Sequence, residues 1–143
     1  MTVLLVGIGN TLRRDDGAGM AVVGRFAERP DCRVLGVHQL LPEHVDELAC
    51  SDRVVFVDAA VDAEQVLLDR VATSTVHTAL GHTCDPAGLL ALCESLHGRT
   101  PVAWLLTIPA YDLGFGEWLS DETAAGVEVA VRRLAEWLAC HTT

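Results

Sequence analysis

The segment VLLVGIGNTLRRDDGAG, residues 3–19, gives the clearest indication of the fold class. It begins with an unbroken apolar run over residues 3–8, which is the profile of a strand buried on both faces of a sheet. Glycines and Asn10 end this strand, and apolar residues then recur at helical spacing over residues 17–28. A buried strand followed at once by a helix is the opening of an α/β pattern.

The rest of the chain continues this alternation. Further strands are expected over residues 33–40, 54–57, 65–71 and 102–108. Further helices are expected over residues 42–49, 85–96 and 120–140, the last two with Asp85 and Ser120 as N-caps. The pattern predicts one domain over residues 1–143, a three-layer α/β/α sandwich around a mostly parallel, twisted sheet of about five strands.

Two of these helices carry a stripe of apolar residues that is expected to face the sheet. In the helix over 85–96 the stripe consists of Leu89, Leu90, Leu92, Cys93 and Leu96. In the helix over 120–140 it consists of Val127, Val131, Leu134 and Leu138.

The composition excludes several classes of function. Half of the residues are hydrophobic, and the formal net charge is −10. An acidic surface repels phosphate backbones, so we expect no nucleic-acid partner. No apolar stretch approaches the roughly 20 residues that a membrane span needs, and the first residues lack the basic flank of a signal peptide. Five scattered cysteines without a C-x-x-C pair indicate free thiols in a reducing compartment, so we expect a cytoplasmic protein.

The loop after the first strand resembles a dinucleotide-binding fingerprint but does not complete it. The third glycine of G-x-G-x-x-G would fall at position 12, which is Leu. Asp15 and Asp16 would also repel a pyrophosphate. Either acid could simply cap the following helix, but capping requires only one of them, which leaves the other available for a site.

Other polar residues are expected at the same edge of the sheet, because ligands of open α/β sheets bind outside the carboxyl ends of the strands. Asp58 follows the apolar run 54–57, and His82 lies in the loop before the helix over 85–96. Two carboxylates and an imidazole would suit a borderline divalent ion such as nickel or zinc. The motifs H-E-x-x-H and G-x-S-x-G are absent, which argues against a zincin or a serine hydrolase.

With these residues assembled, the chain resembles the hydrogenase maturation endopeptidases over essentially its full length. Three ordered blocks carry the resemblance: GIGNTLxxDDGxG at residues 7–19, Phe-Val-Asp-Ala at 56–59, and His-x-x-x-Pro-x-x-Leu-Leu at 82–90. The first block is long and quite specific, and the third is convincing only together with the other two.

The resemblance implies a peptidase, of a family sometimes grouped with the aspartic peptidases, that trims the C-terminal tail of a [NiFe]-hydrogenase large-subunit precursor. It implies that Asp16, Asp58 and His82 contact nickel, and that this nickel belongs to the precursor rather than to the peptidase. A cation near the scissile bond can polarise its carbonyl and lower the pKa of a water molecule. Asp16 or Asp58 could alternatively act as a general base. No organic cofactor is implied.

Two further segments resemble one branch of that family, the branch that serves NAD(P)-linked or bidirectional cytoplasmic hydrogenases. The first is HQLLPE at residues 38–43, and the second is IPAYDLGFGE at residues 108–117. We expect His38 and Gln39 to recognise the precursor. For the second segment, recognition and ordinary packing of Tyr111, Phe115 and Trp118 over the core remain equally open.

Two other functions remain open alongside the peptidase. The chain could be a metal-dependent hydrolase that holds its own zinc or nickel through Asp16, Asp58 and His82. It could also be a non-catalytic sensor that binds a nickel-loaded partner without cutting it.

Overall fold

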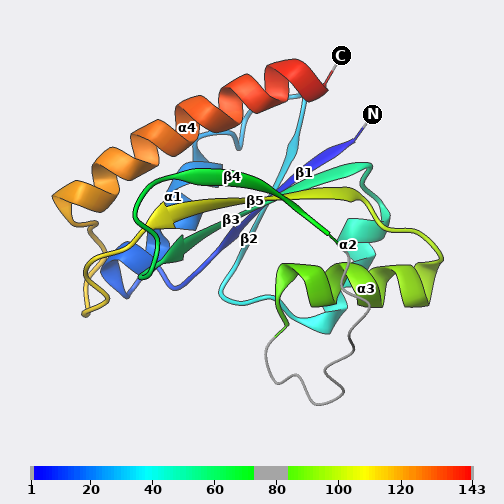
Figure 1. Ribbon diagram of the computed structural model, residues 1–143, viewed down its shortest axis with the longest axis horizontal. Helices are drawn as coiled ribbons and strands as arrows, with labels where there is room; N and C mark the ends of the chain where they lie inside the picture. Colours follow the sequence, from blue (N-terminus) through cyan, green and yellow to red (C-terminus); the bar gives the residue numbers. More distant parts are fainter. Residues whose placement is uncertain (1, 73–83, 143) are drawn as a thin grey trace.

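The computed structural model describes residues 2–72 and 84–142 of the 143-residue chain. Within these ranges the strands form one sheet in the order β2-β1-β3-β5-β4 (Figure 1). They are β1 (Val3–Ile8), β2 (Arg33–Val37), β3 (Arg53–Ala60), β4 (Leu67–Val71) and β5 (Val102–Pro109). Every pairing is parallel except that of β4, which runs antiparallel to β5 at one edge.

Helices cover both faces of the sheet, as Figure 1 shows. On one face lie α1 (Ala18–Gly24) and α4 (Asp121–His141), and on the other lie α2 (Val45–Ala49) and α3 (Pro86–His97). Short 3-10 turns, η1 (Arg14–Gly17) and η2 (Pro42–His44), precede α1 and α2. The predicted three-layer α/β/α sandwich with a mostly parallel five-stranded sheet is therefore confirmed. No helix of the described ranges is long and apolar enough to cross a bilayer.

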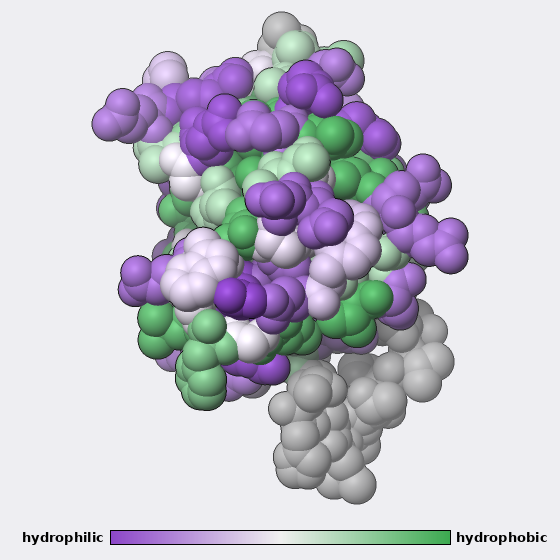
Figure 2. All heavy atoms as spheres, turned by 90° about the vertical axis from the view of Figure 1, so that its left-hand side faces the viewer, coloured by the Kyte–Doolittle hydropathy of each residue, from purple (hydrophilic) through white to green (hydrophobic). Residues whose placement is uncertain are grey.

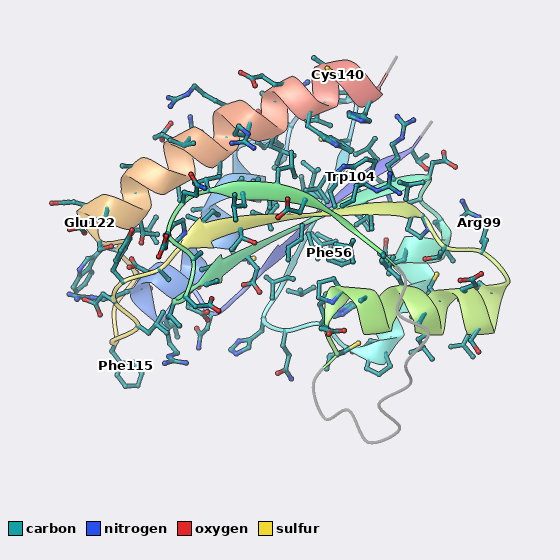
Figure 3. All side chains as sticks on the ribbon, in the orientation of Figure 1. Phe56, Arg99, Trp104, Phe115, Glu122 and Cys140 are labelled. Carbon is teal, nitrogen blue, oxygen red and sulfur yellow. The ribbon has the colours of Figure 1, made fainter. Side chains whose placement is uncertain are left out.

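The two apolar layers are built from alternate residues of the same strands. Val55 and Val57 of β3 pack with α1 and α4, whereas Phe56 packs with α2 and α3 (Figure 3). All three side chains are fully buried. This alternation fixes which way each residue farther along β3 points.

Both predicted N-caps are confirmed. The Asp85 carboxylate accepts the Gly88 N–H at 2.7 Å, and the Ser120 hydroxyl accepts the Thr123 N–H at 3.3 Å. The apolar stripe of α4 packs against the sheet as predicted. In α3 the prediction for Leu96 is wrong: its side chain is 64% exposed, because the buried residues of this helix end one turn earlier, at Cys93.

Some boundaries also differ from the prediction. The β2 strand ends at Val37 and α1 ends at Gly24. The β3 strand continues past Asp58, because Ala59 and Ala60 still pair with Ile108 and Pro109 of β5. Asp58 therefore lies near the end of β3 but still within its paired part. The backbone holds Asp58 more rigidly there than a loop would.

The chain reverses its winding direction at β1. From β1 it moves outward through α1 to β2, and it then returns through α2 to β3 on the other side of β1. Right-handed crossovers in opposite directions put α1 and α2 on opposite faces of the sheet. The carboxyl ends of β1 and β3 flank this topological switch point, where open α/β sheets bind their ligands.

Candidate functional site

Two glycines let the loop after β1 pack directly on the strands. Gly9 has φ +142°, and a Cβ added to it would lie 1.9 Å from the Asp16 carbonyl oxygen. A Cβ on Gly19 would lie 2.2 Å from the Val57 carbonyl oxygen. Gly9, which belongs to the incomplete dinucleotide fingerprint, and Gly19, which does not, thus serve a close approach of η1 and α1 to β1 and β3.

This packing places Asp16 at the switch point. Its side chain is half-buried, and one carboxylate oxygen accepts the backbone N–H of Asn10 at 2.7 Å. Among the residues that the structure describes, the other oxygen of this carboxylate accepts no hydrogen bond. Asn10, which the sequence analysis did not single out, positions the Asp16 carboxylate through its backbone.

Asp58 reaches the same region from β3. Its side chain points to the α2–α3 face, because it has the same parity along the strand as Phe56. It accepts one hydrogen bond among the described residues, from the N–H of Ala59 at 2.9 Å. The register pairs it with Thr107 of β5, so the Thr107 side chain stands next to it on this face. Thr107 is not among the predicted site residues, because its sequence neighbours show only a buried strand.

The surroundings raise the pKa of Asp58. Burial raises the pKa most, and the nearby negative charge of Asp16 adds to this effect. The single hydrogen bond from Ala59 opposes both effects, and the resulting pKa is about 6. Two carboxylates that repel each other, one of them with a pKa near neutrality, are suited to proton transfer or to binding a cation.

Asp15 has a different role from that of its neighbour. Its carboxylate is fully buried and accepts four hydrogen bonds of 2.7–2.8 Å. The donors are the backbone N–H groups of Tyr111, Asp112 and Ser120, and the Ser120 hydroxyl. Burial raises the pKa of Asp15, but the hydrogen bonds outweigh it and lower the pKa to about 2.

The possibility that Asp15 or Asp16 caps the following helix is therefore not realised. Neither η1 nor α1 has a side-chain cap. Asp15 instead ties the loop after β1 to the connection between β5 and α4, and Asp16 is left for the site.

The third candidate ligand, His82, lies outside the described residues. Cys84, two positions later in the chain, packs against the apolar layer on the α2–α3 side, the face to which Asp58 points. Within residues 2–72 and 84–142, no three His, Cys, Asp or Glu side chains form a group able to hold a metal ion. The proposed set of Asp16, Asp58 and His82 remains a prediction.

His38 and Gln39 follow β2 at the same edge of the sheet, and both side chains are exposed. The end of β2 is fixed to the loop after β1 by a hydrogen bond from the Gly9 N–H to the Val37 carbonyl, at 3.0 Å. These two residues thus flank the switch point from the β2 side.

The segment between β5 and α4 leaves its aromatic residues in solvent. Tyr111 is 59% exposed, Trp118 61% and Phe115 91%. Figure 3 shows Phe115 at the outer tip of this connection, pointing away from the sheet. The possibility that these three side chains cover the core is therefore wrong, because α1 and α4 already bury that side.

Solved structures of similar fold include several hydrogenase maturation proteases. The [NiFe] hydrogenase maturation protease HybD from Thermococcus kodakarensis has a TM-score of 0.75 and 26% identity, covering 96% of this chain and 99% of that one. The hydrogenase maturating endopeptidase HybD from E. coli has a TM-score of 0.77 and 22% identity, covering 97% and 93%. The hydrogenase 2 maturation peptidase from Thaumarchaeota archaeon SCGC_AB-539-E09 has a TM-score of 0.71 and 24% identity, covering 97% and 99%.

No family model matches the chain, and no curated protein matches its sequence. The likeness to solved structures nevertheless shows that the chain has the fold of the maturation proteases over nearly its whole length.

Proposed function

We propose that this chain is an endopeptidase that removes the C-terminal extension from the large-subunit precursor of a [NiFe]-hydrogenase. The main support for the proposal is that Asp16 and Asp58 both lie at the switch point of this fold, where the charge of Asp16 raises the pKa of Asp58. The full-length likeness to solved maturation proteases supports it, and so do the three ordered sequence blocks around these acids.

The acids are proposed to act on a precursor that carries nickel as part of the substrate. Asp16, Asp58 and His82 would contact this ion as it enters the switch point. A cation beside the scissile bond withdraws electron density from the peptide carbonyl and acidifies a water molecule. Asp58, with its pKa near 6, is mostly ionised at neutral pH and is able to accept a proton from that water.

Selection of the precursor is assigned to His38 and Gln39, which are exposed beside the acids. Their resemblance to the branch that serves NAD(P)-linked hydrogenases supports a cytoplasmic precursor of that type. If this assignment holds, replacing both residues changes which precursor is accepted more than it changes stability. Unchanged preference across several precursors would remove them from recognition.

The direct test of the proposed activity is intact-mass spectrometry of a large-subunit precursor after incubation with this protein, with and without nickel. The expected result is loss of one defined C-terminal peptide, only from the nickel-loaded precursor. Binding without any change of mass would instead favour a non-catalytic sensor. Stoichiometric nickel or zinc in the purified protein would favour a hydrolase with its own metal.

Variants assign the site residues. Asp16→Asn, Asp58→Asn and His82→Ala are each expected to abolish processing while the circular dichroism spectrum stays that of the wild type. Asp62→Asn is a matched control, because Asp62 is an exposed acid just after β3. Processing at the wild-type rate by any of the three site variants would remove that residue from the site.

A further inference from the structure

Exposed apolar side chains are concentrated at one end of the molecule, which is formed by the loop after β1 and the connection between β5 and α4. Half of the eight large hydrophobic side chains exposed in the described ranges lie there. They are Leu12 at 54% exposure, Tyr111 at 59%, Phe115 at 91% and Trp118 at 61%. In Figure 2, which views this end, pale and green side chains lie among purple hydrophilic ones. Clustered exposed aromatics on a soluble domain are typical of contact surfaces.

These side chains stand on a fixed framework. The backbones of Leu12 and Arg14 exchange hydrogen bonds of 2.9 Å with Gly116, and Asp15 holds the backbone at Tyr111, Asp112 and Ser120. The Arg14 guanidinium forms an ion pair with Asp112 and lies 4.7 Å from the centre of the Trp118 ring. A surface that is already ordered loses little conformational entropy when a partner binds.

A pocket of about 250 Å³ is lined in part by Arg14, the residue whose guanidinium lies over the Trp118 ring. The apolar part of its lining consists of Met20, Ala21 and Leu119. Its charged part consists of the side chains of Arg14 and Glu117. Arg14 is engaged by Asp112, whereas the Glu117 side chain is exposed and makes no ion pair within the described residues. Asp121 and Glu122, both exposed, begin α4 nearby, and Figure 3 shows Glu122 at this end of the molecule.

From these observations we infer that Leu12, Trp118, Phe115 and the adjoining pocket form a docking surface for a second segment of the protein substrate. We call this surface the aromatic platform. The segment it fits presents an apolar side chain beside a basic residue: the apolar group enters the pocket and the cation meets Glu117. The negative surroundings and the net charge of −10 disfavour a nucleic acid or an anionic membrane as the occupant.

The position of the platform explains why the occupant is the substrate. Residues 12–15 support the platform, and the next residue in the chain is Asp16 of the candidate site. A polypeptide held on the platform therefore contacts the loop that carries Asp16. The inference rests on the proposed peptidase function. It gives the enzyme a second contact with its protein substrate, apart from the one assigned to His38 and Gln39.

The test compares Phe115→Ser and Glu117→Lys with Leu96→Ser. Leu96 is a matched control, since it is 64% exposed in the last turn of α3. For processing of the nickel-loaded precursor, each platform variant is expected to raise KM about tenfold, as loss of an interface anchor does, and to leave kcat within about twofold. Leu96→Ser is expected to behave as the wild type. Direct binding of the precursor, measured by isothermal titration calorimetry, is expected to weaken in parallel.

Several results would overturn the inference. Wild-type KM and binding in both platform variants would do so while leaving the peptidase function intact. A wild-type dimer in sedimentation that Phe115→Ser converts to a monomer, with processing unchanged, would assign the platform to a second copy of this chain. Flotation with phosphatidylglycerol vesicles that depends on Phe115 would assign it to a membrane. A wild-type protein that binds the precursor through the platform but never cuts it would refute the peptidase function alone.

Discussion

Asp15 and Asp58 approach the same edge of the sheet from opposite sides of the switch point, yet their surroundings have opposite effects. Asp15 is fully buried and receives four hydrogen bonds, and its pKa falls to about 2. Asp58 receives one hydrogen bond among the described residues and lies near another acid, and its pKa rises to about 6. Ionised Asp15 therefore stabilises the fold, whereas the fold disfavours the ionised form of Asp58.

The two shifts have opposite consequences for stability. A lowered pKa means that ionised Asp15 contributes stability above its unfolded pKa of 3.8, and that this contribution is lost as pH falls toward 2. A raised pKa means that Asp58 costs nothing below about pH 4, where it is protonated in the folded and the unfolded state, and that its cost develops as pH rises toward 6. An unfavourable group that persists in a fold is a mark of a functional site.

The largest expected effect is that of Asp15→Ala. It leaves three partly buried backbone N–H groups and the Ser120 hydroxyl without their acceptor, and we expect a loss of about 3–5 kcal/mol in the free energy of unfolding at pH 7. Urea denaturation followed by circular dichroism measures this loss. Asp62→Ala, at an exposed acid, is expected to change stability by less than about 0.5 kcal/mol. Equal effects of the two variants would show that Asp15 does not anchor the loop.

A smaller effect of opposite sign is expected for Asp58→Asn. Removing the buried charge should stabilise the protein at pH 8 by about 1–2 kcal/mol, a value reduced from the full shift because the group is partly exposed. At pH 4, where Asp58 is protonated, the variant and the wild type should unfold at nearly the same urea concentration. Destabilisation at pH 8 would contradict the distinction between the two acids, whatever the effect on processing.

The smallest effect is expected for Arg14→Ala. Its ion pair with Asp112 and its contact with the Trp118 ring are partly exposed, so their loss should cost about 1 kcal/mol or less. The same denaturation experiment at pH 7 tests this value. A loss as large as that of Asp15→Ala would mean that Arg14, rather than Asp15, holds the loop in place.

The sequence predicted the layers of this fold well because local patterns determine them. The apolar run of β1, the cap at Asp85 and the cap at Ser120 each depend on residues within a few positions in the chain. It also placed Asp16 and Asp58 at one edge of the sheet, since the carboxyl ends of parallel strands meet there.

What the sequence could not predict depends on distant contacts. The partners of Asp15 lie 96–105 residues away, so nothing local distinguishes Asp15 from Asp16. The exposure of Phe115 likewise depends on α1 and α4 already filling that side of the core. The role of His82, outside the described residues, stays a prediction.

The measurement that tests the division between the acids most directly is a carbon-13 NMR titration of the aspartate carboxyl groups, in the wild type and in Asp16→Asn. We predict that Asp58 titrates near pH 6 and Asp15 near pH 2, and that Asp16→Asn lowers the pKa of Asp58 only in part, because burial is the larger cause. If Asp15 and Asp58 both titrated near the ordinary value of about 4, their surroundings would not have the opposite effects on the two carboxyl groups that we infer.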